Sequence, residues 1–422
     1  MYILYSFNMF FSLCIFFLMP YFAVKYLHHN WFNPFSILAL GEFPVFLMKT
    51  FFGPAFLIDG GVLNPYFQFA LFVSNIQLGL QFVSFLVFFL IIRNRTVSVP
   101  LSSVPYSFVQ LKWFCVFFFS LYLLSFVWLA GSSELGLMGW LGNPRLGYQQ
   151  FRSGQGMWYA FAVAFLSLSY TFFCLYTNKI SNLIRGSFFY FVLIYFLGSK
   201  GFLLNFVFFM MICLWFRKWK HLNKIITIGL PVVFSVMLFN LYLALGDLNY
   251  EDILSYFDYF KNATDYFKEY FSGRVGLFNG EILLSSFWGY APRNLFPEKP
   301  IVYGILLVNE IFFPGQAELT NTPAYSAGVE YFADFGLAGV TVFSLFSLTA
   351  LFKAIVVSVA FKDKSVGTCS MSYFSMLAYI ILFSPAFGSF FPGGAFFMLF
   401  ICIMFLLFMV KQWRYLLLSS VR

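Results

Sequence analysis

The segment NPRLGYQQFRSGQG, residues 143–156, carries two arginines at a spacing that suits anion binding. Arg145 and Arg152 are seven residues apart, so two turns of a helix would bring both guanidinium groups to one face. A guanidinium fork matches the paired oxygens of a phosphate. The segment therefore indicates either a phosphate-binding pair or two arginines that snorkel toward lipid headgroups.

A second basic segment presents its charges on an irregular backbone. Arg274 stands in a glycine-flanked stretch, and Arg293 and Lys299 lie in the proline-rich stretch PRNLFPEKP. Proline fixes φ and glycine permits turns, so both stretches favour loops that hold basic side chains in place. Further along the chain, the stretch GVEYFADFG supplies two carboxylates.

The elements that must position these residues belong to a membrane protein. Of 422 residues, 61% are hydrophobic and only 10% are charged, and phenylalanine alone supplies 67. A soluble globule of this composition could not cover its apolar surface. The composition excludes a soluble enzyme, a disordered chain and a disulfide scaffold, and it predicts an all-α polytopic membrane protein. The net charge of +9 does not indicate nucleic-acid binding, because no soluble module carries a basic patch.

Apolar runs of roughly 20 residues predict about eleven transmembrane helices, with a range of 10–12. The second run is the weakest, because Glu42, Pro44, Lys49 and Pro54 interrupt it. The first run lacks a basic leader and a cleavage site, so we interpret it as a retained helix rather than a signal peptide. The runs lie near residues 2–24, 36–57, 66–92, 112–130, 157–177, 183–198, 201–216, 225–245, 335–352, 370–386 and 394–410.

The scarce charges predict which helix ends face outward. By the positive-inside rule, 16 of the 25 basic residues mark inner ends, whereas 14 of the 16 acidic residues lie in outer segments. Three of the outer segments matter most: residues 131–156, residues 198–201 and a large loop of residues 246–334, which is long enough to be functional. The chain thus divides into an N-terminal bundle of residues 1–245, the large loop, and C-terminal helices of residues 335–422.

The large loop begins with a predicted amphipathic helix over residues 251–271, because its aromatic side chains recur at helical spacing. This helix is interpreted as a strut along the membrane interface or as a platform that steers a lipid-linked ligand. The six cysteines of the chain lie in apolar segments without a CxxC pair. Free buried thiols are therefore expected, rather than disulfides or a metal site.

Four stretches of the chain form a set of short motifs that resembles a known family. They are Asn33-Pro34-Phe35; Arg152, Gly154 and Gly156; the Gly198-Ser199-Lys200-Gly201 turn; and residues 292–300, followed by Glu330 and Phe335-Gly336. On these stretches, and in its hydropathy over nearly the whole chain, the sequence resembles the O-antigen polymerases of the Wzy type. That family more often has Arg where Lys200 stands, and lysine keeps the charge but loses the bidentate fork.

The resemblance implies a lipid-linked glycosyltransferase with a GT-C-like architecture in a bacterial inner (cytoplasmic) membrane. The resemblance implies an enzyme that needs neither a metal ion nor a cofactor. Such enzymes transfer a growing polysaccharide from undecaprenyl pyrophosphate to the next lipid-linked oligosaccharide repeat, on the periplasmic side. The partners implied are this lipid-linked substrate, the membrane lipid and a polysaccharide chain-length regulator, and no nucleic acid.

The implied reaction assigns roles to the outer charges. A departing pyrophosphate must be neutralised and an acceptor hydroxyl must lose a proton. Glu281 and Glu330 are the candidate catalytic bases, and Glu281 follows Arg274 by seven residues, on one face if this stretch is helical. Either carboxylate alone is also suited to pairing an arginine. The candidate pyrophosphate-binding residues, with no metal ligand among them, are Arg145, Arg152, Lys200, Arg274 and Arg293.

Three alternative functions stay open from the sequence. An O-antigen ligase relies on an outer histidine, whereas His28, His29 and His221 lie beside basic residues predicted to be cytoplasmic. A lipid-linked oligosaccharide flippase or other transporter usually shows internal repeats and polar residues at the membrane midplane. The sequence shows no internal repeat, and its polar residues gather in the large loop rather than at the membrane midplane. The third alternative is a scaffold without enzymatic activity.

Overall fold

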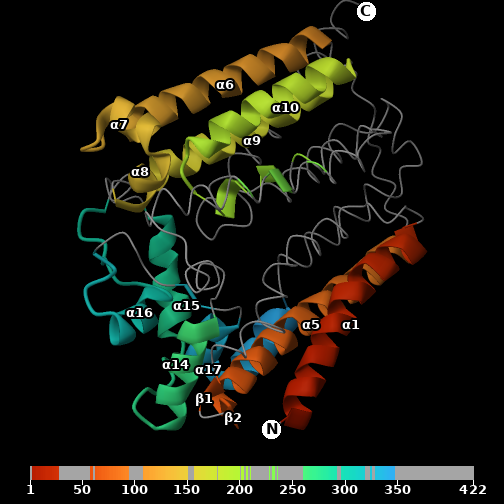
Figure 1. The fold of residues 1–422 in the computed structure, drawn as a ribbon, viewed down its shortest axis with the longest axis vertical. Coiled ribbons are helices and arrows are strands. Elements are labelled where there is room, and N and C mark those ends of the chain that lie inside the picture. The colour runs from red at the N-terminus through yellow and green to blue at the C-terminus, as the bar shows by residue number, and fades with distance from the viewer. Residues whose placement is uncertain are drawn as a thin grey trace, which may run out of the picture.

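The computed structural model shows a helical protein whose described helices form two bundles (Figure 1). Three of the helices, over Pro65–Ile91, Leu111–Gly131 and Gly156–Cys174, are long and apolar enough to cross a membrane, as the composition predicts. The residues described are 2–27, 58–59, 62–94, 108–150, 156–177, 179–199, 201–203, 206–207, 210, 228, 231–232, 235, 260–291, 296–318, 324–325 and 328–346.

The first group, which we call the α9 bundle, surrounds a helix with buried small and aromatic residues. Helices α6 and α9 run antiparallel, since the ring of Trp128 near the end of α6 lies 5.6 Å from that of Trp158 near the start of α9. Helix α10 returns parallel to α6, and the Tyr122 hydroxyl donates to the Leu193 carbonyl oxygen. The bundle consists of α6 (Phe108–Gly131), α7 (Gly136–Gly142), α8 (Pro144–Gln150), α9 (Gly156–Tyr176) and α10 (Ile180–Tyr195).

The second group, which we call the α5 bundle, joins the N-terminal helices to the large loop. Helices α1 and α5 run parallel: Asn8 Nδ2 donates to the Gln68 carbonyl oxygen, and Ser12 Oγ donates to Asn75 Oδ1 one to two turns further along. Both helices therefore start at the same end. The bundle consists of α1 (Tyr2–Leu27), the ladder of β1 (Ile58–Asp59) and β2 (Val62–Leu63), α5 (Pro65–Asn94), α14 (Phe260–Phe271), α15 (Glu281–Ser286), the 3₁₀ helix η2 (Phe287–Tyr290), α16 (Leu306–Phe312) and α17 (Val329–Leu345).

Helix α14 confirms the amphipathic pattern over the described part of the predicted helix, but protein covers its apolar face. Phe260, Tyr266 and Phe267 are buried in a core formed with α5 and α17. The ring of Phe332 lies at the centre of this core, edge-on to the rings of Phe69 and Phe267 at 5.6 and 5.0 Å. A strut along lipid would need that face exposed, so the structure assigns α14 to the protein core instead.

Helix α17 folds back on itself at a two-residue bend. Phe335 and Gly336 leave helical geometry, and Gly336 has φ 65° and ψ −155°, a conformation that is essentially restricted to glycine. The halves lie so close that the Tyr331 and Phe343 rings stack at 5.2 Å. The bend falls where the sequence predicts the span of residues 335–352 to begin.

Described helices coincide with five of the predicted spans, and three of these, near residues 66–92, 112–130 and 157–177, are long and apolar enough to cross a membrane. The other two coincident spans lie near residues 2–24 and 183–198. The predicted spans near residues 36–57, 370–386 and 394–410 lie outside the described residues, and those near 201–216 and 225–245 lie largely outside them. The count of eleven spans, the GT-C-like architecture and the domain boundaries therefore stay predictions.

Candidate functional site

Two of the predicted outer segments meet at one end of the α9 bundle. The Trp140 indole of α7 is buried and donates through Nε1 to the Phe196 carbonyl oxygen at 2.9 Å. Gly198, at φ 74°, lies so close to the Pro144 carbonyl group that a Cβ there would clash. The short helices α7 and α8 are thus packed on the turn that follows α10, and sequence-distant outer segments become one surface.

Arg145 lies on this surface. Its Nη1 atom is 3.5 Å from the Gly198 carbonyl oxygen, and its guanidinium lies 5.6 Å from the centre of the Tyr148 ring. The structure therefore brings Arg145 to the turn that precedes Lys200. Lys200 itself and Arg152 lie outside the described residues, and α8 ends at Gln150, so the predicted shared helical face of the two arginines is not tested.

Asp334 holds the bend of α17 to the large loop. Its buried carboxylate accepts the backbone N–H groups of Gly280 at 2.7 Å, Ile282 at 3.2 Å and Leu283 at 2.9 Å. These are donors at the start of α15, which the helix itself cannot satisfy. A carboxylate is the favoured acceptor at that position, because it also complements the helix dipole.

The broken backbone of α17 is satisfied by the same loop. The carbonyl groups of Ala333 and Asp334 precede the bend and accept the N–H groups of Phe278 and Asn279, both at 2.9 Å. Asn279 and Gly280 have positive φ, which turns the chain sharply into α15. Backbone and side-chain bonds together therefore fix the loop against the end of the first half of α17.

Glu330 lies one helical turn before Asp334, in a partly buried position on α17. Burial raises the pKa of the Glu330 carboxyl above its ordinary value, and the neighbouring Asp334 carboxylate raises it further. A carboxyl group in such surroundings gains affinity for a proton, which is the property of a general base that acts near neutral pH. Glu330 is thus the candidate carboxylate with an environment suited to catalysis.

Glu281 and Arg274 occupy different surroundings. Glu281 is exposed in the first turn of α15, and Arg274 pairs with Glu269 at 2.8 Å with its side chain 67% exposed. The predicted helical face shared by Arg274 and Glu281 is wrong, because the chain between α14 and α15 is a turn with Gly273 and Gly280 at positive φ. Helical spacing therefore does not align these two charges.

Arg293, the last candidate cation, lies outside the described residues. Its described neighbour Lys299 donates through Nζ to the Ala291 carbonyl oxygen at 3.1 Å and lies over the Tyr303 ring. Within the described ranges, no group of three or more His, Cys, Asp or Glu side chains is placed to hold a metal ion.

The sequence alone did not show that Asp334 has a structural role while Glu330 is the candidate for chemistry. Both carboxylates sit in GVEYFADFG, four residues apart. The available signal was the Phe-Gly pair that follows Asp334, since a helix interrupted there leaves carbonyl groups for a loop to satisfy. The partner that uses Asp334 lies about fifty residues earlier in the chain, so no local pattern identified it.

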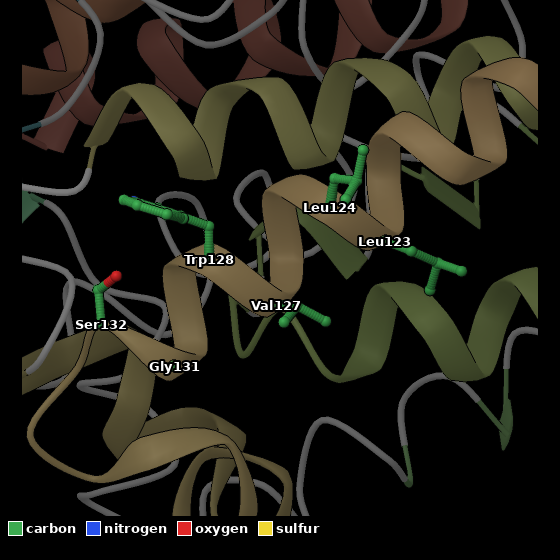
Figure 2. A pocket seen from close by; sticks show the side chains of 6 residues that line it. All are labelled: Leu123, Leu124, Val127, Trp128, Gly131 and Ser132. Carbon is green, nitrogen blue, oxygen red and sulfur yellow. The ribbon is translucent and has the colours of Figure 1, made fainter.

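The groove on α6 offers different chemistry. Figure 2 shows the side chains that line it, which project from α6 at its end nearest α7. The groove encloses about 420 Å³, and its only polar side chain is that of Ser132. The groove lies on a helix that is apolar enough to cross a membrane, so its apolar lining suits contact with lipid. We assign no catalytic role to it. The lining residues are Leu123, Leu124, Val127, Trp128, Gly131 and Ser132.

Two curated proteins are similar to this chain. They are the O-antigen polymerases of Salmonella typhimurium and Salmonella typhi, each 26% identical over 245 residues. The matched region covers 57% of this chain and 58% of each relative, so the chain spans little more than half the length of these proteins. No family model matches the sequence, and no solved structure matches it. The resemblance to O-antigen polymerases that the motifs indicate is thus confirmed by relatives of that name.

Proposed function

We propose that the protein polymerises lipid-linked oligosaccharide repeats into O-antigen or a related surface polysaccharide, at the periplasmic face of a bacterial inner membrane. The observation that carries this proposal is the match of 245 residues to two O-antigen polymerases. The growing chain would leave undecaprenyl pyrophosphate and join the non-reducing end of the next lipid-linked unit. A chain-length regulator of the same process is a proposed partner.

Glu330 is the proposed base. The acceptor hydroxyl forms the new glycosidic bond, its proton passes to the Glu330 carboxylate, and the bond between the sugar and the pyrophosphate breaks. The supporting observation is the environment of Glu330, which raises its pKa while Asp334 fixes the neighbouring loop. Glu281, exposed at the start of α15, is the second candidate for this role.

Arg145 is the proposed first contact of the leaving pyrophosphate. Its position on the turn before Lys200 supports a cationic site at the outer end of the α9 bundle. Cations held in a low-dielectric site stabilise the charge that develops on a leaving group. Guanidinium and ammonium groups fill the role of a metal in this proposal. The remaining proposed ligands of the pyrophosphate are Arg152, Lys200, Arg274 and Arg293.

The test is complementation in cells that lack the native gene. Wild-type protein restores long polysaccharide ladders. Glu330→Gln keeps the shape of the side chain but cannot accept the proton, so polymerisation falls by about 10²–10⁴-fold while single-repeat caps persist. Glu298→Gln, exposed in the same loop, is the matched control and leaves the ladders intact. Wild-type ladders from both Glu330→Gln and Arg145→Ala would contradict the proposed site.

The same strains separate the alternative functions. Loss of all capping after gene deletion indicates a ligase, whereas loss of chain length alone indicates a polymerase. Export of unpolymerised repeats at the normal level excludes a flippase. Purified protein that elongates the native lipid-linked repeat without other proteins excludes a scaffold.

A further inference from the structure

Helix α15 and the 3₁₀ helix η2 expose a continuous apolar surface, which we call the α15 face. Leu284 and Phe287 are 70% and 66% exposed, and Leu283 and Trp288 are also exposed. Leu283 and Phe287 are four residues apart, as are Leu284 and Trp288, so these side chains share a side of the segment. Ile282 and Ser286, on the opposite side, are buried. Phe296 extends the surface, with its ring 6.5 Å from that of Trp288. Exposed apolar residues that form a contiguous patch mark an interaction site.

The position of the α15 face is fixed relative to the membrane-crossing helices. Asp334 binds the start of α15 directly to the bend of α17. The first half of α17 packs on α5, where Gly328 lies against Val73. Figure 1 shows α15 near α17, which in turn packs on α5, a helix long and apolar enough to span a bilayer. Because Phe332 of α17 contacts Phe69 in the first turns of α5, and Asp334 follows Phe332, α15 is held near the end of α5 at which the apolar run begins.

The residue composition of the α15 face suits the membrane–water interface. Tryptophan is favoured at the membrane–water interface, and tryptophan, phenylalanine and leucine together form the apolar face of helices that lie in that interface. Lys299 flanks the surface and lies over the Tyr303 ring at 4.6 Å, which places a cation beside the apolar patch. The apolar face of α14, the other amphipathic element of the loop, is already covered by α5 and α17.

We propose that the α15 face inserts into the interfacial region of the lipid leaflet at this end of the helices and anchors the large loop there. The occupant is the lipid itself. Anchoring acts on the loop that Asp334 holds, and thus on the first half of α17, which carries Glu330. This inference does not depend on the proposed polymerase activity, because it concerns the membrane contact of the folded chain.

The experiment uses full-length protein in lipid nanodiscs. A fluorophore is attached to Leu284→Cys, and in a second sample to Lys268→Cys, on the exposed side of α14, with the six native cysteines replaced in both. Lipids brominated in the acyl chain should quench the label at position 284 and not the label at 268. A water-soluble quencher should give the opposite order. Equal access of the water-soluble quencher to both labels would overturn the proposal.

A second measurement avoids the cysteine replacements. Brominated lipids quench the intrinsic tryptophan fluorescence of the wild type, and Trp288→Phe should lose part of that quenched signal. An unchanged quenched signal would count against lipid contact at Trp288. Two outcomes would assign another occupant and overturn the proposal: protection of position 284 in detergent that rises with protein concentration, which indicates a second copy, or protection there only after a polyprenyl pyrophosphate is added.

Discussion

The α9 bundle is built on a regular helix, whereas the α5 bundle contains a helix, α17, that is interrupted at Phe335 and Gly336. In α9, Ser167 and Thr171 donate to carbonyl groups one turn earlier in the same helix, and Ser169 meets the Tyr190 hydroxyl at 2.6 Å. In the α5 bundle, a loop donates to two backbone carbonyl groups at the broken end of α17, and the Asp334 carboxylate accepts N–H groups at the start of α15. Regular helices satisfy themselves in a membrane, whereas an interrupted helix needs partners from elsewhere.

This difference explains where the candidate carboxylate of Glu330 lies. A loop held against a helix end brings charged groups into partly buried positions without exposing unpaired backbone to lipid. The α9 bundle instead keeps its interrupted backbone at its end, where Gly136 and Gly198 turn the chain and Arg145 lies. The comparison predicts that changes in the α5 bundle disturb stability and chemistry together, while those in the α9 bundle separate the two.

The largest expected effect is that of Asp334→Ala. Three backbone N–H groups lose their acceptor, which should lower the free energy of unfolding by at least about 3 kcal/mol. Hydrogen exchange should rise sharply in residues 278–283 and remain unchanged in α9. Ser169→Ala is the matching change in the α9 bundle and should cost about 1 kcal/mol.

Asp334→Asn refines this prediction. The amide keeps one acceptor oxygen but turns an N–H₂ group toward the donors, so it should restore only part of the protection lost in Asp334→Ala. Equal hydrogen exchange of residues 278–283 in the wild type and in Asp334→Ala would contradict the role given to this carboxylate. It would also contradict the proposed difference between the two bundles.

The second effect concerns the fold-back of α17. A Cβ at Gly339 would lie 2.5 Å from the Tyr331 carbonyl oxygen and 2.7 Å from Phe335 Cβ. Gly339→Ala should therefore force the two halves apart and lower the unfolding free energy by about 1–3 kcal/mol. The control is Gly131→Ala in α6, where a Cβ meets nothing within 4 Å and a small gain from helix propensity is expected. Thermal unfolding of the purified protein measures both, and a shift of equal sign would show that the fold-back is not tight.

The third effect is a pH-dependent gain in stability from Glu330→Gln. The folded-state pKa of Glu330 is raised above its ordinary value of 4.5, so the unfavourable burial of its charge is absent below that value and develops as pH rises through the folded-state pKa. Glu330→Gln removes the charge, so its melting temperature should match the wild type at pH 4 and exceed it at pH 8. A constant difference across this range would mean that Glu330 is not held in a charge-disfavouring site.

The sequence predicts the α9 bundle better than it predicts the α5 bundle. Apolar runs locate α6 and α9 because a membrane-crossing helix depends on composition alone. The fold-back of α17 depends on one glycine conformation and a contact between Tyr331 and Phe343, which hydropathy does not register. The pairing of Asp334 with α15 joins positions about fifty residues apart, so it follows from tertiary packing rather than from any local pattern.

The candidate site, like the fold, was predicted only in part from the sequence. The residue types and the predicted side of the membrane made Arg145 and Glu330 functional candidates. The structure adds the turn that contacts Arg145 and the burial of Glu330. The seven-residue spacing of Arg274 and Glu281 does not place them on one helical face, because the chain between them is not helical and has positive φ at Asn279 and Gly280. Spacing aligns side chains only where the backbone is helical throughout.

The smallest expected effect is that of Arg274→Ala on stability. The ion pair with Glu269 is largely exposed, so its loss should change the unfolding free energy by no more than about 1 kcal/mol, and less at high salt. Polymerisation tests the other role of this side chain: if Arg274 contacts the pyrophosphate, Arg274→Ala lowers the rate while Glu269→Ala, which frees the guanidinium, does not. Equal rate losses in both variants would restrict Arg274 to pairing Glu269. Unchanged rates in both would exclude Arg274 and leave the cationic part of the site to the other proposed ligands, Arg145, Arg152, Lys200 and Arg293.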